Sequence, residues 1–77
     1  MRVASVIKTD KNGFIVSMDS FGIYEEQISD DVTIEAEAKF IELSRYEGVH
    51  EDNAEDALED GFVEGNNHII SIVWSNI

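Results

Sequence analysis

Runs of β-branched and aromatic residues, which are typical of β-strands, occur near both ends of this chain. Residues 3–8 and 14–18 are short runs of β-branched and aromatic side chains, and Asn12-Gly13 between them supplies the positive-φ positions of a hairpin turn. Residues 62–64 lead through a Gly-Asn-Asn turn into residues 68–74, which are apolar on both faces, as in a central strand. The pattern predicts an N-terminal hairpin and a last strand inserted within the sheet.

Helical signals occupy the middle of the chain, after a connection that contains Gly22. Asp30 and Asp31 stand at the N-cap position of a segment, residues 32–46, whose first apolar residues alternate as in a strand. Its Ala, Glu and Lys residues are good helix formers, and its later apolar residues recur at the i, i+4, i+7 spacing of one helical face. We therefore predict a helix there, ended by Gly48.

A second, shorter helix is predicted from Glu51 to Asp60, closed by Gly61. The element order is then strand, strand, helix, helix, strand, strand (ββααββ). With 77 residues the chain has room for a single domain, residues 1–77. The predicted fold is α+β, a small two-layer sandwich in which an antiparallel sheet of three to four strands carries both helices on one face.

The charge balance restricts the possible functions. Seventeen Asp and Glu residues stand against five Lys and Arg, which gives a formal net charge of −12. Such a surface excludes direct binding of nucleic acid, which needs cations for the phosphates, and docking on anionic membranes. The chain has no cysteine, which excludes disulfides and a thiolate zinc site. It shows neither a membrane-length apolar run nor a signal peptide at its start, so a cytoplasmic location is expected.

The second predicted helix has one entirely anionic face. At about 100° per residue its acidic residues fall within half of the helix circumference, and its Ala and Leu residues lie opposite. These candidates for partner binding are Glu51, Asp52, Glu55, Asp56, Glu59 and Asp60. They give about one charge per 3 Å of helix axis, close to the one per ~3.4 Å of a DNA strand.

This arrangement costs stability, since like charges four residues apart destabilise a helix by about 0.2 to 0.5 kcal/mol per pair. The first predicted helix differs, because Glu35 can pair with Lys39 and Glu42 with Arg45. A basic partner would explain why the acids of the second helix are left unpaired. A face that only keeps the domain soluble and a face that binds cations are the alternative interpretations.

Two further patterns could carry chemistry, and both favour a structural interpretation. Residues 10–13 are similar to the middle of a calcium-binding loop, but no bidentate Glu closes the loop and strands flank it, which favours a hairpin turn. His50 and His68 have neither a nucleophile nor a second His at a recognisable spacing, so we interpret them as turn and strand-end residues. The chain is expected not to be an enzyme and to use no cofactor or metal.

As a short, acidic, cysteine-free α+β chain with a regularly acidic segment, residues 51–60, the sequence resembles as a class the small phage-encoded inhibitors of bacterial defence, including anti-CRISPR and DNA-mimic proteins. This resemblance assigns no role to any individual residue. The primary hypothesis is a non-enzymatic inhibitor that occupies the basic nucleic-acid channel of a defence or nucleic-acid-processing protein. Steric exclusion of DNA or RNA would be its mechanism, and electrostatic steering would make binding fast and salt-dependent.

Two other functions stay open at this point. One is an immunity or antitoxin protein that covers the active site of a cognate toxin. The other is an acidic adaptor module that uses an apolar patch around Tyr24 or Trp74. These two residues and Phe21 are the aromatics expected nearest the surface, either as core-edge residues or as interface anchors. The target and the oligomeric state are left open.

Overall fold

The computed structural model describes residues 2–23 and 30–76 and is an α+β fold with a four-stranded antiparallel sheet and two helices. Its elements are β1 (Arg2–Asp10), β2 (Ile15–Ile23), α1 (Asp30–Tyr46), α2 (Glu51–Ala57), β3 (Phe62–Glu64) and β4 (His68–Asn76). The strand order is β2-β1-β4-β3, so the last strand pairs with both β1 and β3. The sequence prediction that this strand is inserted in the sheet is confirmed.

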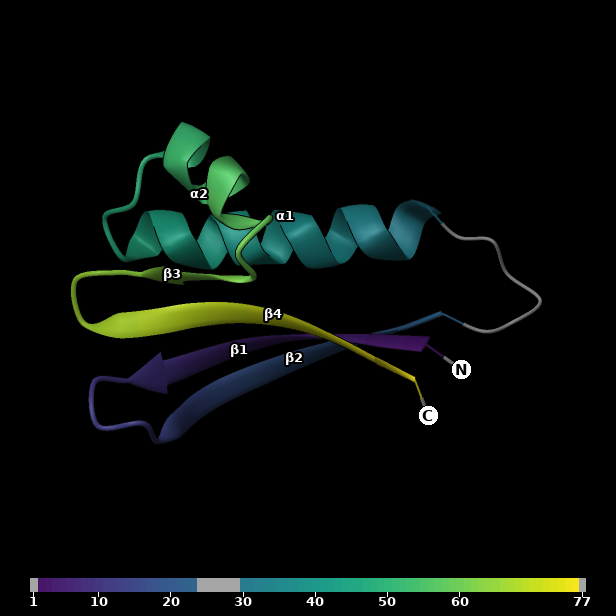
Figure 1. Ribbon diagram of the computed structural model, residues 1–77, viewed down its shortest axis with the longest axis horizontal. Coiled ribbons are helices and arrows are strands. Elements are labelled where there is room, and N and C mark those ends of the chain that lie inside the picture. Colours follow the sequence, from purple (N-terminus) through teal and green to yellow (C-terminus); the bar gives the residue numbers. More distant parts are fainter. Residues whose placement is uncertain (1, 24–29, 77) are drawn as a thin grey trace.

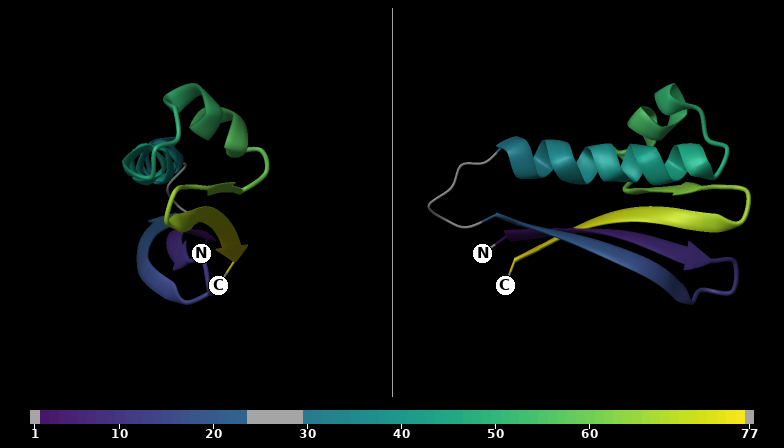
Figure 2. Two further views of the ribbon diagram at one scale, coloured as in Figure 1. Left: turned by 90° about the vertical axis from the view of Figure 1, so that its left-hand side faces the viewer. Right: turned by 180° about the vertical axis from the view of Figure 1, so that it is seen from behind.

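Both helices lie on the same side of the sheet (Figure 1). Helix α1 runs along the strands and contacts β1, β4 and β2, while the short α2 packs beside α1 and against β3. The end-on view shows α2 next to α1, with the twisted sheet below them (Figure 2). The helices therefore form one layer, and the opposite face of the sheet has no helix over it.

The hydrophobic core fills the space between the sheet and α1. Every second residue of β1 and β4 points toward the helices, as expected for the two-residue period of a strand. These residues meet small and aromatic side chains of α1, and the buried set comprises Ala4, Val6, Ala36, Phe40, Ile70 and Ile72. Phe21 and Trp74 are partly buried against this cluster, which confirms them as core-edge residues.

The N-terminal hairpin forms as predicted, but with a different turn. Gly13 has a positive φ of 93°, whereas no other described residue except Gly48 and Gly61 has a positive φ, so Asn12 does not adopt the predicted conformation. The Gly13 N–H donates to the carbonyl of Asp10, and the Asp10 side chain accepts from the N–H groups of Asn12 and Phe14 at 2.9 Å each. The turn is a three-residue loop in which Gly13 alone adopts the left-handed conformation. Asn12 therefore keeps a negative φ.

Strand β2 is longer than the sequence indicates, and the predicted connection at Gly22 is wrong. Gly22 lies inside β2 opposite Val3, and pairing continues to the end of both strands. Glycine weakens a strand only modestly, and the nine-residue partner β1 supplies hydrogen bonds along the whole length. An irregularity between Lys8 and Thr9 shifts the register by one residue near the turn.

The first helix begins at Asp30 and ends where predicted. Asp30 and Asp31 belong to its first turn rather than preceding it as caps. At its other end Gly48 has a φ of 82°, its N–H donates to the carbonyl of Arg45, and the N–H of Val49 donates to the carbonyl of Ser44. This pair of bonds satisfies carbonyls that the helix leaves free, and it confirms Gly48 as the terminating residue.

Candidate functional site

Helix α2 is held by a cap at one end and by two alanines along its inner side. The Nδ1 atom of His50 accepts a hydrogen bond from the N–H of Asp52 at 3.2 Å, which makes His50 the N-cap residue. Ala54 and Ala57 are buried, and α2 contacts α1 and β3. Small side chains let the short helix approach closely, so its acidic side faces outward.

The predicted helix from Glu51 to Asp60 is wrong at its C-terminal end, because α2 stops at Ala57. The chain turns there: the N–H of Gly61 donates to the carbonyl of Ala57, and the carbonyl of Gly61 accepts from Ile72 of the central strand. Gly61 has a φ of 84°, which lets the chain leave the helix and enter β3. Glu59 and Asp60 therefore lie in a turn after the helix, and the acids do not follow one helical pitch throughout.

All six predicted binding residues are exposed. Four of them, Glu51, Asp52, Glu55 and Asp56, lie on α2, and the other two lie in the following turn. We call these six residues the acidic surface. Within residues 2–23 and 30–76, none of them forms an ion pair with Lys or Arg. Asp52 alone has an ion-pairing partner, the Nδ1 of His50 at 3.8 Å, which is charged only when protonated.

Three of the five Lys and Arg residues contact groups outside the acidic surface. Lys11 pairs with Glu64 at 2.7 Å, Lys39 pairs with Glu42 at 3.5 Å, and the Arg2 guanidinium lies over the Trp74 ring at 4.6 Å. Lys39 thus pairs with Glu42 rather than with the predicted Glu35. The predicted ion pair between Glu42 and Arg45 is absent from the described part of the chain. The charge of α1 is partly compensated within the helix, as predicted, but by another pair.

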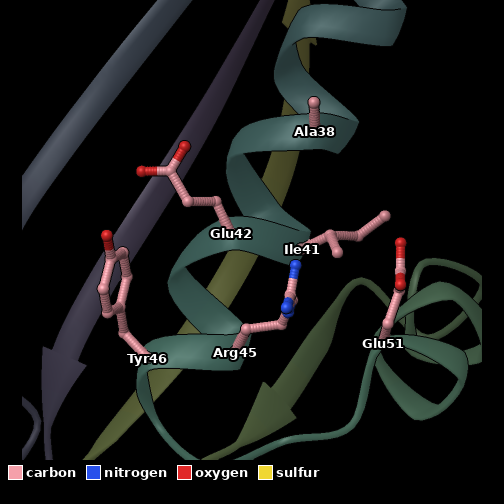
Figure 3. Close-up of a pocket in the computed structure, with 6 residues that line it drawn as sticks. All are labelled: Ala38, Ile41, Glu42, Arg45, Tyr46 and Glu51. Atoms are coloured by element: carbon pink, nitrogen blue, oxygen red, sulfur yellow. The ribbon is translucent and has the colours of Figure 1, made fainter.

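Arg45 is the cation nearest in sequence to the acidic surface, and it borders an open hollow beside α2. This hollow of about 660 Å³ is lined by Ala38, Ile41, Glu42, Arg45, Tyr46 and Glu51. The Arg45 side chain lies along Ile41, with Glu51 of α2 across from it (Figure 3). Arg45 and Glu51 line the same hollow, whereas no Lys or Arg of the described residues forms an ion pair with Glu55, Asp56 or Glu59.

Glu47 is a buried acid that the sequence analysis did not identify. Its carbonyl accepts from the N–H of Asn66 at 3.0 Å, and its Oε1 atom accepts from the N–H of Asn67 at 2.9 Å. The Nδ1 atom of His68 lies 3.2 Å from the same oxygen without the alignment of a hydrogen bond. Glu47 therefore fixes the turn between β3 and β4 to the end of α1. No local pattern in the sequence marks Glu47, because the Asn67 N–H that it binds lies 20 residues away.

The surroundings of Glu47 act on its pKa in opposite directions. Burial raises the pKa of Glu47, but the hydrogen bond from the Asn67 N–H and the nearby His68 outweigh burial and hold the pKa below its ordinary value of 4.5. A carboxylate whose pKa is lower in the folded than in the unfolded chain stabilises the fold at pH above the unfolded value. This stabilisation is lost as the pH falls through the folded value.

We expect Glu47→Gln to flatten part of the pH dependence of stability. The difference in free energy of unfolding between the wild type and this variant should be largest near neutral pH and shrink below about pH 4.5, measured by urea unfolding at pH 3 to 7. Glu64→Gln is the matched control: Lys11 also lowers the pKa of Glu64, but solvent screens this exposed pair. An equal or larger effect of Glu64→Gln would contradict the expectation.

The two histidines have structural positions, as the sequence indicated. His50 caps α2, and His68 is the first residue of β4. Within the described residues, no group of three or more His, Asp or Glu side chains could hold a metal ion. None of the described helices combines the length and the apolar character that crossing a membrane requires. Tyr24, one of the two predicted anchors of an adaptor, lies outside the described residues.

Comparison with known proteins finds no family model, curated protein or solved structure that matches this chain. A functional inference must therefore start from the chemistry of its own surface.

Proposed function

We propose that this chain is a non-enzymatic inhibitor whose acidic surface binds the basic nucleic-acid-binding surface of another protein and excludes DNA or RNA from it. The observation that carries the proposal is that all six acids are exposed while none is paired with a Lys or Arg of the described chain. Like charges four residues apart cost helix stability, and a basic partner would turn this cost into binding energy.

The binding chemistry is that of Lys and Arg side chains, which normally hold phosphates. Carboxylates on successive turns of α2 offer these cations acceptors at a spacing close to that of phosphates along one strand. The turn with Glu59 and Asp60 extends the acidic surface beyond the helix end, toward β3. A basic channel in a CRISPR-type or other defence protein is the partner class that fits the resemblance of the acidic segment to phage-encoded inhibitors.

Association between oppositely charged surfaces is fast at low salt and weakens as salt screens it. The first step of the test is therefore capture of host proteins on the immobilised chain at low and at high salt, with identification by mass spectrometry. The second step uses a captured protein after purification. Fluorescence anisotropy of a labelled DNA duplex then measures whether the chain displaces nucleic acid from it.

The decisive variant reverses three acids, Glu55→Lys, Asp56→Lys and Glu59→Lys. We expect the apparent inhibition constant of this variant to rise at least about 100-fold. Several charge pairs of about 1 kcal/mol or more are lost and replaced by repulsion. A control with Glu35→Lys, Glu37→Lys and Glu42→Lys makes the same change in net charge on α1. Unchanged displacement by the folded α2 variant, or an equal loss in the α1 control, would overturn the proposal.

A further inference from the structure

The face of the sheet opposite the helices has an unusual composition. We call this face the outer face and assign residues to it from the strand register. Its residues are Val3, Ser5, Ile7 and Thr9 of β1, Ile15, Met18 and Ser20 of β2, Phe62 and Glu64 of β3, and Ile69, Ser71, Val73 and Ser75 of β4. Neither helix covers it (Figure 1). The uncovered face of an antiparallel sheet is usually polar, whereas apolar residues hold a position in every strand here.

Large apolar side chains of the outer face are exposed in the single chain. The exposed fractions are 62% for Ile15, 56% for Met18, 55% for Phe62 and 47% for Val73. Val3, Ile7 and Ile69 are partly buried between them. Exposed apolar side chains gathered on one face of a sheet, here interleaved with Ser and Thr, are typical of an interaction surface.

The outer face also lacks charge, although the chain carries a net charge of −12. Among the described residues that the register places there, Glu64 is the one charged residue, and it lies at the end of the face in an ion pair with Lys11. Helix α2, which carries four of the six residues of the acidic surface, lies on the other side of the sheet (Figure 2). The acidic surface and the nearly uncharged outer face thus lie on opposite sides of the molecule.

The lack of charge on the outer face indicates which kind of partner binds there. A strongly basic partner is attracted to the helix layer and gains nothing from an uncharged face. A second copy of this chain offers the same uncharged, serine- and valine-containing face, and a two-fold axis makes such a face complementary to itself. Two sheets packed face to face lie about 10 Å apart. The two helix layers would then be about 30 Å apart, several times the Debye length of ~8 Å at physiological salt, so their repulsion is largely screened.

We propose that two copies of this chain associate through their outer faces and form a four-layer dimer with both acidic surfaces outward. Three nine-residue strands make a face of about 30 by 14 Å, or roughly 400 Å² before side-chain relief is counted. An interface of this size is small for a stable dimer, so we expect the association to be weak and reversible. The proposal does not depend on what the acidic surface binds.

Sedimentation equilibrium over a range of about 1 µM to 1 mM tests the association directly. We expect the mass to rise from 8.7 kDa toward twice that value at about 0.15 M salt. Lowering the salt to about 0.01 M lengthens the Debye length to about 30 Å and should weaken the dimer, because the acidic layers then repel each other. This salt dependence is opposite to that expected for the acidic surface on a basic partner, so failure of one proposal is distinguishable from failure of the other.

Two lysines on the outer face test its location. The double variant Met18→Lys, Val73→Lys should lower the association constant at least about 100-fold, since each lysine would have to be buried. Both substitutions reduce the net negative charge, so stronger overall repulsion cannot be the cause of the loss. Ile34→Lys is the matched control: Ile34 is 62% exposed, like Ile15, but lies on α1, and its variant should associate as the wild type does. Circular dichroism spectra establish that each variant is folded.

Backbone amide NMR spectra recorded on dilution distinguish the faces of the molecule. Shifts concentrated on outward-pointing residues of β1 and β4 support the proposal. Shifts confined to the free edge of β2 would mean edge-to-edge pairing and would overturn it. A monomeric mass up to 1 mM at both salt concentrations would overturn it as well, and so would a dimer that the Ile34→Lys control disrupts as strongly as the double variant.

Discussion

Replacement of Gly65 by alanine is expected to lower the free energy of unfolding by about 3 kcal/mol, a large share of the stability of so small a domain. Gly65 begins the turn between β3 and β4, and its N–H donates to the carbonyl of His68 at 2.8 Å. An added Cβ would overlap the Cβ of Glu47, and it would lie 3.1 Å from the His68 carbonyl. Neither neighbour can move freely, because Glu47 is hydrogen-bonded to Asn66 and Asn67 and His68 belongs to the central strand.

Urea unfolding of the purified variant measures this effect, and the chain offers a matched control. Gly22 lies inside β2 with no atom within 4 Å of an added Cβ, so Gly22→Ala should change stability by no more than about 0.5 kcal/mol. Removing the opposing Cβ provides a rescue: in a Glu47→Gly background, Gly65→Ala should cost far less than in the wild type. Equal costs of Gly65→Ala in both backgrounds would show that contact with Glu47 does not explain the effect.

Much of the architecture could be predicted because it depends on local patterns. The β-branched and aromatic runs on either side of the turn mark β1 and β2, the apolar run marks β4 as a central strand, and Gly48 marks the end of α1. The errors occur where tertiary contacts override local preference. The sequence predicts a connection at Gly22, but this residue is paired with Val3 of the long strand β1. The sequence predicts that residues 58–60 continue the helix, but the chain turns there to enter β3.

The candidate site shows the same division. The exposure of the six acids follows from helical periodicity, because Ala54 and Ala57 take the buried side. The position of the cations could not be predicted in the same way, since Lys11 and Glu64 are 53 residues apart in the sequence. The same holds for Glu47, whose partners lie about 20 residues away in a turn. The outer face was not recognised either, because its apolar residues appear in the sequence as the second side of strands that are apolar on both faces.

Truncation of Phe40 to alanine is expected to have a larger effect than truncation of any other described residue, because Phe40 is the largest of the fully buried side chains. Phe40 is fully buried between α1 and the sheet, and the deletion of a buried phenylalanine side chain costs about 3 to 5 kcal/mol. The total stability of 77 residues is roughly 4 to 12 kcal/mol by the usual range per residue. The variant should therefore lose from about a quarter to all of this stability, which thermal unfolding followed by circular dichroism measures as a lower midpoint temperature.

Phe14→Ala makes the same chemical change at a position where 70% of the side chain is exposed, and it should shift the free energy of unfolding by no more than about 0.5 kcal/mol. Both variants are measured at the same concentration, about 1 µM, so that self-association does not add to the difference. A small effect of Phe40→Ala would mean that the neighbouring alanines and Ile70 collapse into the space, since an unfilled cavity is what makes the truncation costly. Such a result would contradict a core held by one large side chain of α1 against β1 and β4. A large effect would show that burial of this side chain supplies much of the stability of the fold that positions α1, α2 and the acidic surface.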